Sequence, residues 1–309
     1  MKILAKYGKD DLATVFVGET SSGVLVEFVQ SLQPPLDRSE KWVLIVSTLR
    51  GCPVGCLMCD AGSYYEGKLS YQDILEQIEF LVRYYFPNGK IETKKFKIQF
   101  ARVGEPAFNE NVLLVLKKLS CYENLLPSIS TVAPEGTDVF FEGLLELKNK
   151  YYHGKFQLQF SIHSTDETER NQIIPIKKWS FEKISEYGNK FVSDGDRKIT
   201  LNFAVAKNYQ LDPQVIKRFF DPAKFLIKIT PVNPTYNALK NSIDSDVDLQ
   251  TGMPMTHKDF VEELLRTGYE VILSIGELEE NQIGSNCGQY VRKHLIEKGK
   301  FIQAYSYVR

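Results

Sequence analysis

The sequence has no apolar run long enough to span a membrane. Lysines interrupt residues 1–6 before any long apolar region begins, so the chain does not start with the pattern of a signal peptide. Internal repeats and low-complexity tracts are absent as well. These absences exclude membrane-spanning and repeat architectures, and we expect a cytoplasmic protein that has no membrane partner.

The chain also lacks an excess of charge of either sign. It has 38 Lys and Arg residues against 39 Asp and Glu residues, and a formal net charge of −1. This balance argues against a surface dominated by affinity for nucleic acid. Local basic groups remain, but most such groups are solvated helix or strand faces. They are Lys94-Lys95-Phe96-Lys97, Lys117-Lys118, Lys177-Lys178 and Arg292-Lys293.

Cysteine is scarce and unevenly placed. Three of the five cysteines lie within the eight residues Cys52-Pro53-Val54-Gly55-Cys56-Leu57-Met58-Cys59. This loop follows an apolar run, 42–46, that predicts the first buried strand of a sheet. An odd number of cysteines with three on one loop fits a reducing compartment better than a disulfide framework.

Three thiolates on one short loop favour a metal cluster, because thiolate selects zinc, copper(I) or iron-sulfur clusters over hard cations. A structural zinc site normally takes four ligands, often as two separated pairs, and the chain has no second Cys-x-x-Cys. A 4Fe-4S cluster on Cys52, Cys56 and Cys59 would leave one iron open. The alternatives are cysteines that are buried close together by chance and a zinc site completed by a distant histidine.

Strand and helix patterns alternate after residue 40, which predicts parallel βα units. The 309 residues and the hydrophobic content of 43% suffice for one large core. Before these units, two β-rich stretches predict a hairpin. We therefore expect an α/β fold, a partial (β/α)6 barrel over 39–309 with an N-terminal β-hairpin extension over 1–38. Strands are expected at 12–18, 23–29, 42–46, 96–100, around 129, 156–162, 199–205, 225–229 and 270–273, and helices at 71–85, 112–119 and 139–147.

Polar residues follow several of these strands at the point where each strand ends. The carboxyl ends of parallel strands share one edge of a sheet, where the following loops and helix N-termini open. We therefore expect the chemistry of this protein at that edge. The residues are Gly104-Glu105-Pro106, Ser130, Ser161-Ile162-His163 and Asn233-Pro234.

The cysteine loop resembles the Cys-x-x-x-Cys-x-x-Cys signature of the radical S-adenosylmethionine (SAM) superfamily, although Met58 stands where an aromatic residue is most common. A closer resemblance, to the RlmN and Cfr family of RNA adenine methyltransferases, covers the chain from about residue 18 to residue 289. Four further sequence motifs carry this resemblance, in the order and at the spacing of the family. They are Gly104-Glu105-Pro106-Ala107-Phe108-Asn109, Ser161-Ile162-His163 with Arg170 and Ile174-Pro175-Ile176-Lys177-Lys178, Ile229-Thr230-Pro231-Val232-Asn233-Pro234, and Asn286-Cys287-Gly288-Gln289.

This resemblance implies a radical SAM barrel and a radical SAM enzyme, with a 4Fe-4S cluster on Cys52, Cys56 and Cys59 whose open iron binds SAM. Glu105 suits the SAM site because a carboxylate accepts hydrogen bonds from the SAM amino group and offsets its positive charge. Taken one at a time, such residues are also ordinary strand-end, interior or turn residues. By the resemblance, the SAM site is lined by Gly104, Glu105, Ser130, Ser161, His163 and Asn233.

In the family, one cysteine carries a transferable methyl group, and the match assigns this role to Cys287. The resemblance implies that a second SAM is cleaved to a 5′-deoxyadenosyl radical and that the methyl-derived carbon is added to an sp2 carbon of the substrate. An electron donor such as flavodoxin or ferredoxin is then an expected partner. Glu27 aligns with a family glutamate proposed as a proton acceptor, although an exposed strand glutamate is an equal interpretation.

Two departures from the family pattern concern the last step and the substrate. Ile45 stands where the family has a second cysteine that resolves the covalent adduct, and isoleucine can neither take a proton nor form a disulfide. The remaining cysteine, Cys121, is expected on the opposite face of the sheet as a packing residue. Family members also carry a helical N-terminal domain that docks RNA, whereas this chain begins almost at the hairpin, which weakens the expectation of an RNA partner.

Three functions remain open from the sequence. The first is a methyltransferase that loads Cys287 and modifies RNA or another unsaturated substrate, with Glu27 or water in place of the missing cysteine. The second is a radical SAM enzyme in which Cys287 gives a hydrogen atom to a peptide or small-molecule radical. The third is a non-catalytic protein that binds RNA or a metabolite on a relic barrel. A long polar segment, 236–257, is either a lid or a disordered surface loop.

Overall fold

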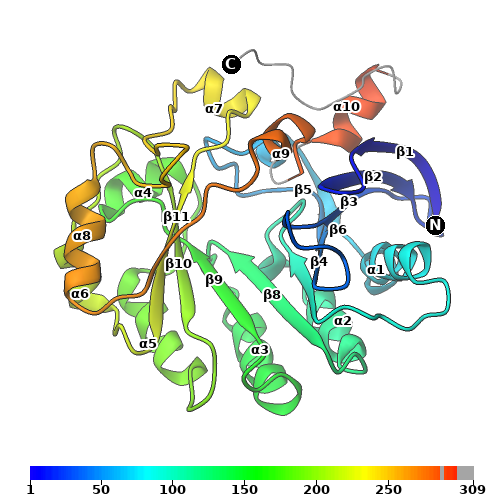
Figure 1. Ribbon diagram of the computed structural model, residues 1–309, viewed down its shortest axis with the longest axis horizontal. Coiled ribbons are helices and arrows are strands. Elements are labelled where there is room, and N and C mark those ends of the chain that lie inside the picture. Colours follow the sequence, from blue (N-terminus) through cyan, green and yellow to red (C-terminus); the bar gives the residue numbers. More distant parts are fainter. Residues whose placement is uncertain (286–288, 298–309) are drawn as a thin grey trace.

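One mixed sheet of ten strands forms the centre of the computed structural model, which describes residues 1–285 and 289–297 (Figure 1). The order across the sheet is β1 (Lys2–Gly8), β2 (Ala13–Glu19), β3 (Leu25–Ser31), β4 (Lys41–Val46), β7 (Lys95–Phe100), β8 (Leu125–Thr131), β9 (Gln157–Ser161), β10 (Ile199–Val205), β11 (Phe225–Pro231) and β12 (Val271–Leu273). Neighbours pair antiparallel from β1 to β4 and parallel from β4 to β12. The described sheet therefore runs linearly from β1 to β12, in keeping with the predicted α/β partial barrel.

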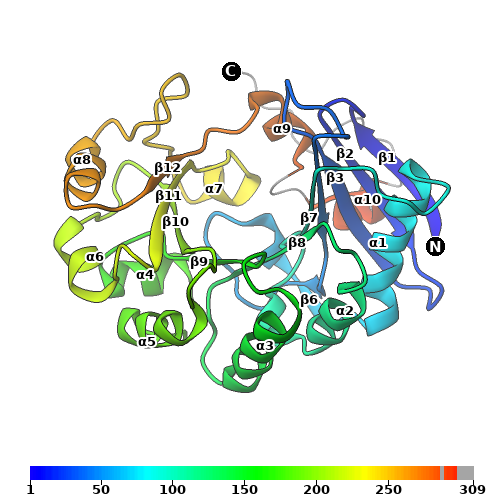
Figure 2. The same cartoon turned by 60° about the horizontal axis from the view of Figure 1, so that its bottom comes forward.

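Helices cover the convex side of this curved sheet (Figures 1 and 2). Those on the convex side are α1 (Tyr71–Tyr85), α2 (Asn111–Leu119), α3 (Asp138–Tyr151), α5 (Phe181–Phe191), α6 (Pro213–Phe219) and α8 (Lys258–Arg266). Three others follow the carboxyl ends of strands, and these are α4 (Glu167–Ile173), α7 (Tyr236–Lys240) and α9 (Leu278–Ile283), while α10 (Tyr290–Glu297) comes after α9. Within the described ranges, no helix has the length and apolar composition of a membrane span.

Helix α1 shows how local sequence determines where an element begins. Ser70 Oγ accepts a hydrogen bond from the Asp73 N–H (3.1 Å), and the Asp73 carboxylate accepts one from the Ser70 N–H (3.0 Å). Together they satisfy donors that the first helical turn leaves unpaired. Apolar residues recur at helical spacing, and Ile74, Ile78 and Leu81 are fully buried. The predicted helix over 71–85 is confirmed.

The parallel strands turn apolar residues toward the helices and polar residues toward the concave side. In β7, Phe96, Ile98 and Phe100 are fully buried under the helices, whereas Lys97 and Gln99 alternate with them and face the other way. The main core therefore lies between the sheet and its convex helix layer, and polar groups remain on the concave side.

The N-terminal strands continue the main sheet. β2 and β3 confirm the predicted hairpin, but β1, which pairs with β2, was not predicted. Its burial alternates between exposed and half-buried residues, as in an edge strand without a strong apolar pattern. Helix α1 packs against one face of these strands, and α9 and α10 pack against the other. The division into an extension over 1–38 and a barrel over 39–309 stays a prediction.

The long polar segment after β11 is folded. It contains α7 and the isolated β-bridges of Ala206 with Ser245 and Val247 with Pro254. Asp246 is fully buried and accepts hydrogen bonds from the N–H (3.0 Å) and Oγ1 (2.7 Å) of Thr256. Of the two alternatives for this segment, the disordered surface loop is therefore wrong, because a buried carboxylate gives the segment a polar anchor.

Cys121 lies between α2 and β8, at the amino-terminal edge of the sheet, where the sequence predicted it. Its side chain is an exposed free thiol. The expected packing role is therefore wrong, because this side chain is exposed at the turn.

A buried ion pair ties α3 to the turn before β10. Lys148 Nζ lies 2.5 Å from Asp196 Oδ2, and both side chains are almost fully buried. Asp196 also accepts hydrogen bonds from the N–H groups of Gly154 (2.8 Å) and Ser193 (3.0 Å). Burial by itself would raise the pKa of the Asp196 carboxyl, but Lys148 and these N–H groups bring it below its usual value. Asp196 is therefore held as a charged partner.

We expect Asp196→Asn to lower the free energy of unfolding by about 3 kcal/mol, because it leaves the Lys148 ammonium group buried without a charged partner. Urea and thermal unfolding measure the change. The exposed pair of Lys183 with Asp138 is the matched control, and Asp138→Asn should cost less than about 1 kcal/mol. Equal losses in the two variants would contradict this account.

Candidate functional site

The three clustered cysteines lie on the loop between β5 (Leu49–Gly51) and β6 (Tyr65–Lys68), a separate two-stranded sheet. The side chains of Cys52, Cys56 and Cys59 are half-buried. The loop turns sharply, since a Cβ atom on Gly62 would lie only 2.6 Å from the Gly55 Cα atom. Glycine at both positions lets the loop fold back on itself and keep the thiols in one region.

Side chains at the start of α7 hold the far end of the cysteine loop. Asp60, one residue after the last cysteine, accepts the N–H of Asn237 (2.9 Å). The sequence pointed to the preceding Asn233-Pro234 motif but missed these supports, because short polar side chains carry no signal of a distant partner. Three side chains at the two ends of α7 donate hydrogen bonds to carbonyl oxygens of the cysteine loop. These bonds run from Thr235 Oγ1 to Met58 (2.6 Å), from Asn237 Nδ2 to Cys59 (2.8 Å) and from Asn241 Nδ2 to Leu57 (2.8 Å).

Glu105 is enclosed at the carboxyl end of β7. Its Oε1 accepts hydrogen bonds from the Ala107 N–H (3.0 Å) and Thr131 Oγ1 (2.5 Å), and its Oε2 accepts one from the Val132 N–H (2.8 Å). Burial raises the pKa of the Glu105 carboxyl to about 7, although the three hydrogen bonds oppose this shift. Glu105 thus joins the ends of β7 and β8, and Thr131 is a site residue that the sequence did not single out.

Glu105 and Cys52 are neighbours in the folded chain. Burial raises the pKa of the Cys52 thiol to about 12, with a smaller contribution from the Glu105 carboxylate. The backbone N–H groups of Val54, Glu105 and Gly55 act in the other direction, because they stabilise a thiolate. N–H donors of this kind around a cysteine sulfur are a feature of iron-sulfur sites.

The cysteine loop therefore fits a cluster by its donor chemistry. Three soft thiol ligands on one loop match a cluster that takes three protein ligands. In the described part of the chain, no three His, Cys, Asp or Glu side chains converge closely enough to ligate a metal ion as they stand. The fit thus depends on ligand type and on the shared loop.

Two of the predicted serines lie near the carboxyl ends of neighbouring strands on the concave side. Ser130 Oγ accepts hydrogen bonds from the Nε2 atoms of Gln99 and Gln159 (both 3.3 Å). Ser161 pairs in register with Asn202 on β10. The buried Oδ1 of Asn202 has no hydrogen-bond partner among the described residues, which leaves it available to a ligand. Asn202 is a second site residue that the sequence did not reveal.

His163 follows β9 with a left-handed backbone (φ 65°), a conformation that is uncommon for residues other than glycine. Its Nδ1 accepts the Ala204 N–H (3.1 Å), so the ring proton lies on Nε2. Burial, with a smaller effect of Arg170, lowers the pKa of His163 to about 4, which keeps the ring neutral. Asn233 is half-buried in the loop after β11, and its carbonyl accepts the Thr235 N–H (2.8 Å).

Lysine side chains gather toward the amino-terminal end of the concave side. Lys97 on β7, Lys228 on β11 and Lys41 on β4 lie near enough to influence one another. Burial and then the charges of these two neighbours lower the pKa of Lys97 to about 7. This end of the concave side therefore favours anions.

Glu27 is fully buried on β3, so the alternative of an exposed strand glutamate is wrong. Its Oε1 lies 2.9 Å from Arg102 Nη2 in an ion pair that solvent does not reach. Its Oε2 accepts the Val291 N–H from α10 (2.7 Å). Burial raises the pKa of the Glu27 carboxyl, while Arg102 and the α10 N–H groups oppose the shift. Sequence reasoning missed Arg102, which carries no motif of its own.

Cys287, the predicted methyl carrier, lies outside the described residues. The described chain before and after it, α9 and α10, packs on β2 and β3. Ile45, at the position of the expected second cysteine, belongs to the same apolar cluster as Ile283 and Tyr290. The Ile45 side chain therefore contributes packing under these helices and no chemistry.

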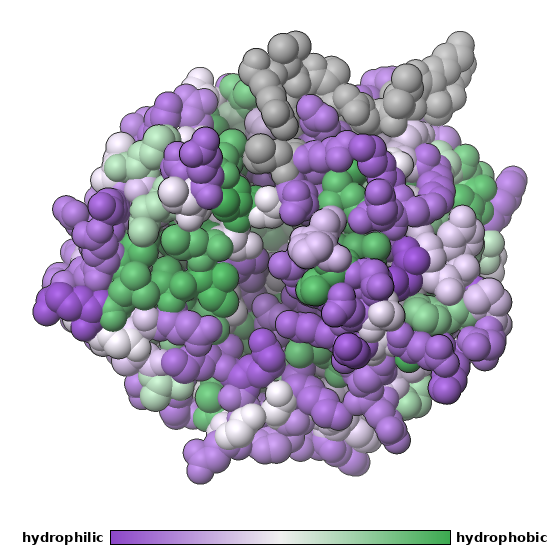
Figure 3. Space-filling view, viewed as in Figure 1, coloured by the Kyte–Doolittle hydropathy of each residue, from purple (hydrophilic) through white to green (hydrophobic). Residues whose placement is uncertain are grey.

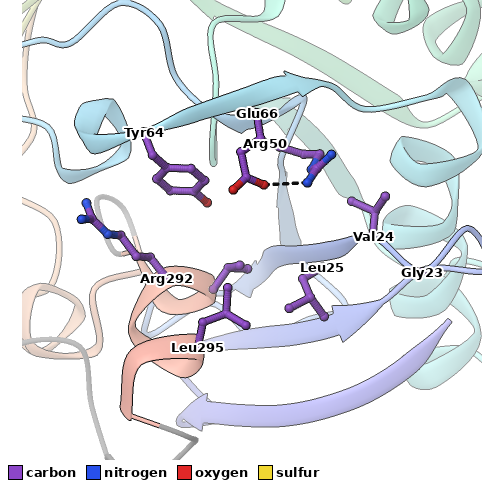
Figure 4. A pocket seen from close by; sticks show the side chains of 9 residues that line it. Gly23, Val24, Leu25, Arg50, Tyr64, Glu66, Arg292 and Leu295 are labelled. Atoms are coloured by element: carbon purple, nitrogen blue, oxygen red, sulfur yellow. Dashed lines mark hydrogen bonds and ion pairs between the residues drawn. The ribbon is translucent and has the colours of Figure 1, made fainter.

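A cavity of about 490 Å³ lies beside the cysteine loop, between the β2–β3 turn, the β5–β6 hairpin and α10 (Figure 4). Arg50 and Glu66 form an ion pair in its wall (2.6 Å). The Tyr64 carbonyl accepts the Cys52 N–H (2.9 Å), so this wall is continuous with the cysteine loop. The Tyr64 ring and the exposed Arg292 offer an aromatic surface and a cation to a ligand.

Curated proteins match the chain over most of its length, although no known family profile does. A probable RNA methyltransferase of Rhodopirellula baltica is 26% identical over 295 residues, which cover 92% of this chain and 71% of that protein. The dual-specificity RNA methyltransferase RlmN of Wolinella succinogenes is 25% identical over 321 residues, which cover 96% of this chain and 82% of that protein.

A solved structure shares the fold. A radical SAM methyltransferase from Sphaerobacter thermophilus matches with a TM-score of 0.69 at 17% identity, over 93% of this chain and 80% of that one. The chain resembles the RlmN family of radical SAM enzymes. SuiB of Streptococcus suis matches with a TM-score of 0.52 at 13% identity, over 77% of this chain and 49% of that one, which is a likeness of fold alone.

These matches confirm three predictions from the sequence: the resemblance to the RlmN family, the mostly parallel α/β fold, and the enzyme class, a radical SAM enzyme of the methyltransferase type. The RlmN-type motifs within the described residues follow strands that end at one edge of the sheet, where Glu105 lies beside Cys52.

Gly104 has a strict backbone requirement in this RlmN-type site. Its φ is 107°, and a Cβ atom there would lie 2.5 Å from the Leu49 Cβ atom. Gly67 has a similar φ of 118°, but nothing lies within 4 Å of its Cβ position. The two glycines therefore share the same strain on substitution and differ in the steric clash.

We expect Gly104→Ala to displace the loop that carries Glu105 and to weaken SAM binding at least about tenfold. Calorimetric titration of the reconstituted protein with SAM measures the affinity. Gly67→Ala is the control and should change the affinity less than about twofold, because it adds strain without the clash. An equal effect of both substitutions would show that the contact with Leu49 does not matter.

Proposed function

We propose that this protein is a radical SAM methyltransferase that carries a 4Fe-4S cluster on Cys52, Cys56 and Cys59 and passes a methyl group through Cys287 to an sp2 carbon of its substrate. One observation carries the proposal. The loop that carries Glu105 lies against the chain just before Cys52, since the Val103 carbonyl accepts the Leu49 N–H (3.1 Å), so two motifs far apart in the sequence meet. The RlmN-type relatives support the same class of reaction.

The residues of the chain would bind and orient SAM beside the thiols. When bound, the reduced cluster supplies the single electron that cleaves SAM to a 5′-deoxyadenosyl radical. The Glu105 carboxylate keeps lone pairs beyond the three bonds it makes, and these would accept the SAM amino group. Neutral His163 would donate from Nε2. The other proposed SAM residues are Gly104, Ser130, Ser161 and Asn233.

RNA is the substrate class that this proposal favours. The names of the relatives point to RNA, and one feature of the described chain supports it. The cavity with Tyr64 and Arg292 beside the cysteine loop suits a stacked base and its phosphate. An electron donor such as flavodoxin or ferredoxin would complete the set of partners.

One observation favours a second candidate function. Ile45 is buried under α9 and α10 and cannot resolve a covalent adduct as a cysteine would. In this alternative, Cys287 donates a hydrogen atom to a radical on a peptide or small molecule, and no methyl group is carried.

Cys56→Ser should abolish the cluster, because a hard hydroxyl replaces one of three soft ligands. Wild-type protein reconstituted anaerobically with iron and sulfide should bind about four irons, and the variant should lose SAM cleavage at least about 100-fold. Cys121→Ser is the control, because this exposed thiol lies at the other edge of the sheet and should leave both values unchanged. Full iron binding by Cys56→Ser would contradict the assignment.

Mass spectrometry of the Cys287 peptide, after incubation with SAM and a reductant, tests the proposed function. We expect a methyl group on Cys287. Release of 5′-deoxyadenosine with an unmodified Cys287 would support the hydrogen-atom alternative. Neither product, in a protein that contains its cluster, would contradict both functions.

Arg292→Ala should weaken the binding of a single-stranded RNA oligonucleotide. It should also reduce the slope of log affinity against log salt concentration by about 1, because one phosphate contact is lost. Fluorescence anisotropy at several salt concentrations measures both. Lys190→Ala is the control, because Lys190 is an exposed cation on α5, in the helix layer on the convex side of the sheet. It should change neither the affinity nor its salt dependence. An RNA affinity that Arg292→Ala leaves intact would exclude this cavity from substrate binding.

A further inference from the structure

The buried pair of Glu27 and Arg102 joins α9 to α10. Arg102 Nη1 donates to the carbonyl oxygens of Gly284 (2.7 Å) and Ser285 (2.5 Å), at the end of α9. Glu27 Oε2 accepts the Val291 N–H in the first turn of α10 (2.7 Å). Since Arg102 Nη2 and Glu27 Oε1 are only 2.9 Å apart, one ion pair holds the described chain on both sides of residues 286–288.

Arg102 is itself anchored to the carboxyl edge of the parallel sheet. Its backbone N–H donates to the carbonyl of Val46, the last residue of β4 (3.0 Å). It stands three positions before Glu105, on the loop that reaches Cys52. The ion pair therefore couples α9 and α10 to the same loop that contacts the cysteines.

Neither carboxylate oxygen of Glu27 is open to a substrate. The side chain is 1% exposed, Oε1 faces a guanidinium group, and Oε2 holds the Val291 N–H. A general base must come within hydrogen-bond reach of the proton that it accepts. The contacts of Glu27 instead fix the direction in which α10 begins.

From these contacts we infer that Glu27 and Arg102 are positioning residues, which hold the ends of α9 and α10, and thereby the chain on both sides of Cys287, against the sheet edge that carries Glu105. This inference rests on the proposed function of Cys287. A guanidinium group bonded to two carbonyls and one carboxylate sets orientation as well as distance. Apolar packing of equal volume would give comparable or greater stability, so stability alone does not account for a buried ion pair here.

Three variants separate the parts of this arrangement. Glu27→Gln keeps an oxygen for the Val291 N–H and removes the charge. Arg102→Lys keeps the charge and loses the planar fork. Arg102→Met removes both, and it should lower the rate of Cys287 methylation per folded protein at least about tenfold, because small misplacements of reacting groups cost rate steeply. The two conservative variants should fall between it and the wild type, and the SAM dissociation constant should change less than about twofold in all three.

Asp196→Asn is the matched control, because it breaks another buried ion pair that lies between α3 and the turn before β10. It should destabilise the protein and leave the methylation rate per folded molecule unchanged. An equal loss of methylation in Asp196→Asn would overturn the positioning role. The positioning role would also be overturned if Glu27→Gln methylates Cys287 at the normal rate and fails only to transfer the group to the substrate. That pattern would make Glu27 the proton acceptor.

A second measurement tests the inference without SAM. Peptide mass spectrometry gives the rate at which iodoacetamide alkylates Cys287, relative to the rate for Cys121 in the same protein. Arg102→Met should change this ratio at least about fivefold, and Asp196→Asn should leave it within about twofold. A changed ratio in a protein whose Cys287 never gains a methyl group would overturn the proposed function and keep the positioning role. An unchanged ratio would overturn the positioning role.

Discussion

Parallel hydrogen bonding from β4 through β7 to β11 is the constraint on which the rest of this structure depends. It requires every loop that follows one of these strands to open at the same edge of the sheet. The loop with Glu105, the turn with His163 and the loop before α7 therefore meet there. The cysteine loop reaches the same edge because it follows β4, the strand at which parallel pairing begins.

Two buried ion pairs join segments of the fold that are distant in the chain. Asp196 and Lys148 neutralise each other on the convex side, away from the cysteines. Glu27 and Arg102 neutralise each other between β3, the end of β7 and the C-terminal helices. Because an uncompensated buried charge is strongly unfavourable, each pair ties together segments that apolar contacts alone would leave free to shift.

Local signals in the sequence predicted the elements that have strong local causes. The capping residues Ser70 and Asp73 and the spacing of apolar residues sufficed for α1, and the apolar runs sufficed for the parallel strands. β1 was missed because an edge strand with mixed exposure lacks a clear pattern. For the segment with Asp246, the alternative of a disordered loop was wrong because the polar composition hides a carboxylate that folds inward and is bonded there.

The sequence by itself determined the chemistry of the cysteine loop, because ligand type and close spacing are local properties, and the order of strands and helices, because periodicity is local too. Only the tertiary structure decided which partners the key side chains have. Glu27 finds Arg102 from the end of β7 and Val291 from α10, and Glu105 finds Thr131 and Cys52. These contacts join residues that are far apart in the chain, so no local pattern announces them, and burial then excludes the water that would otherwise satisfy each group.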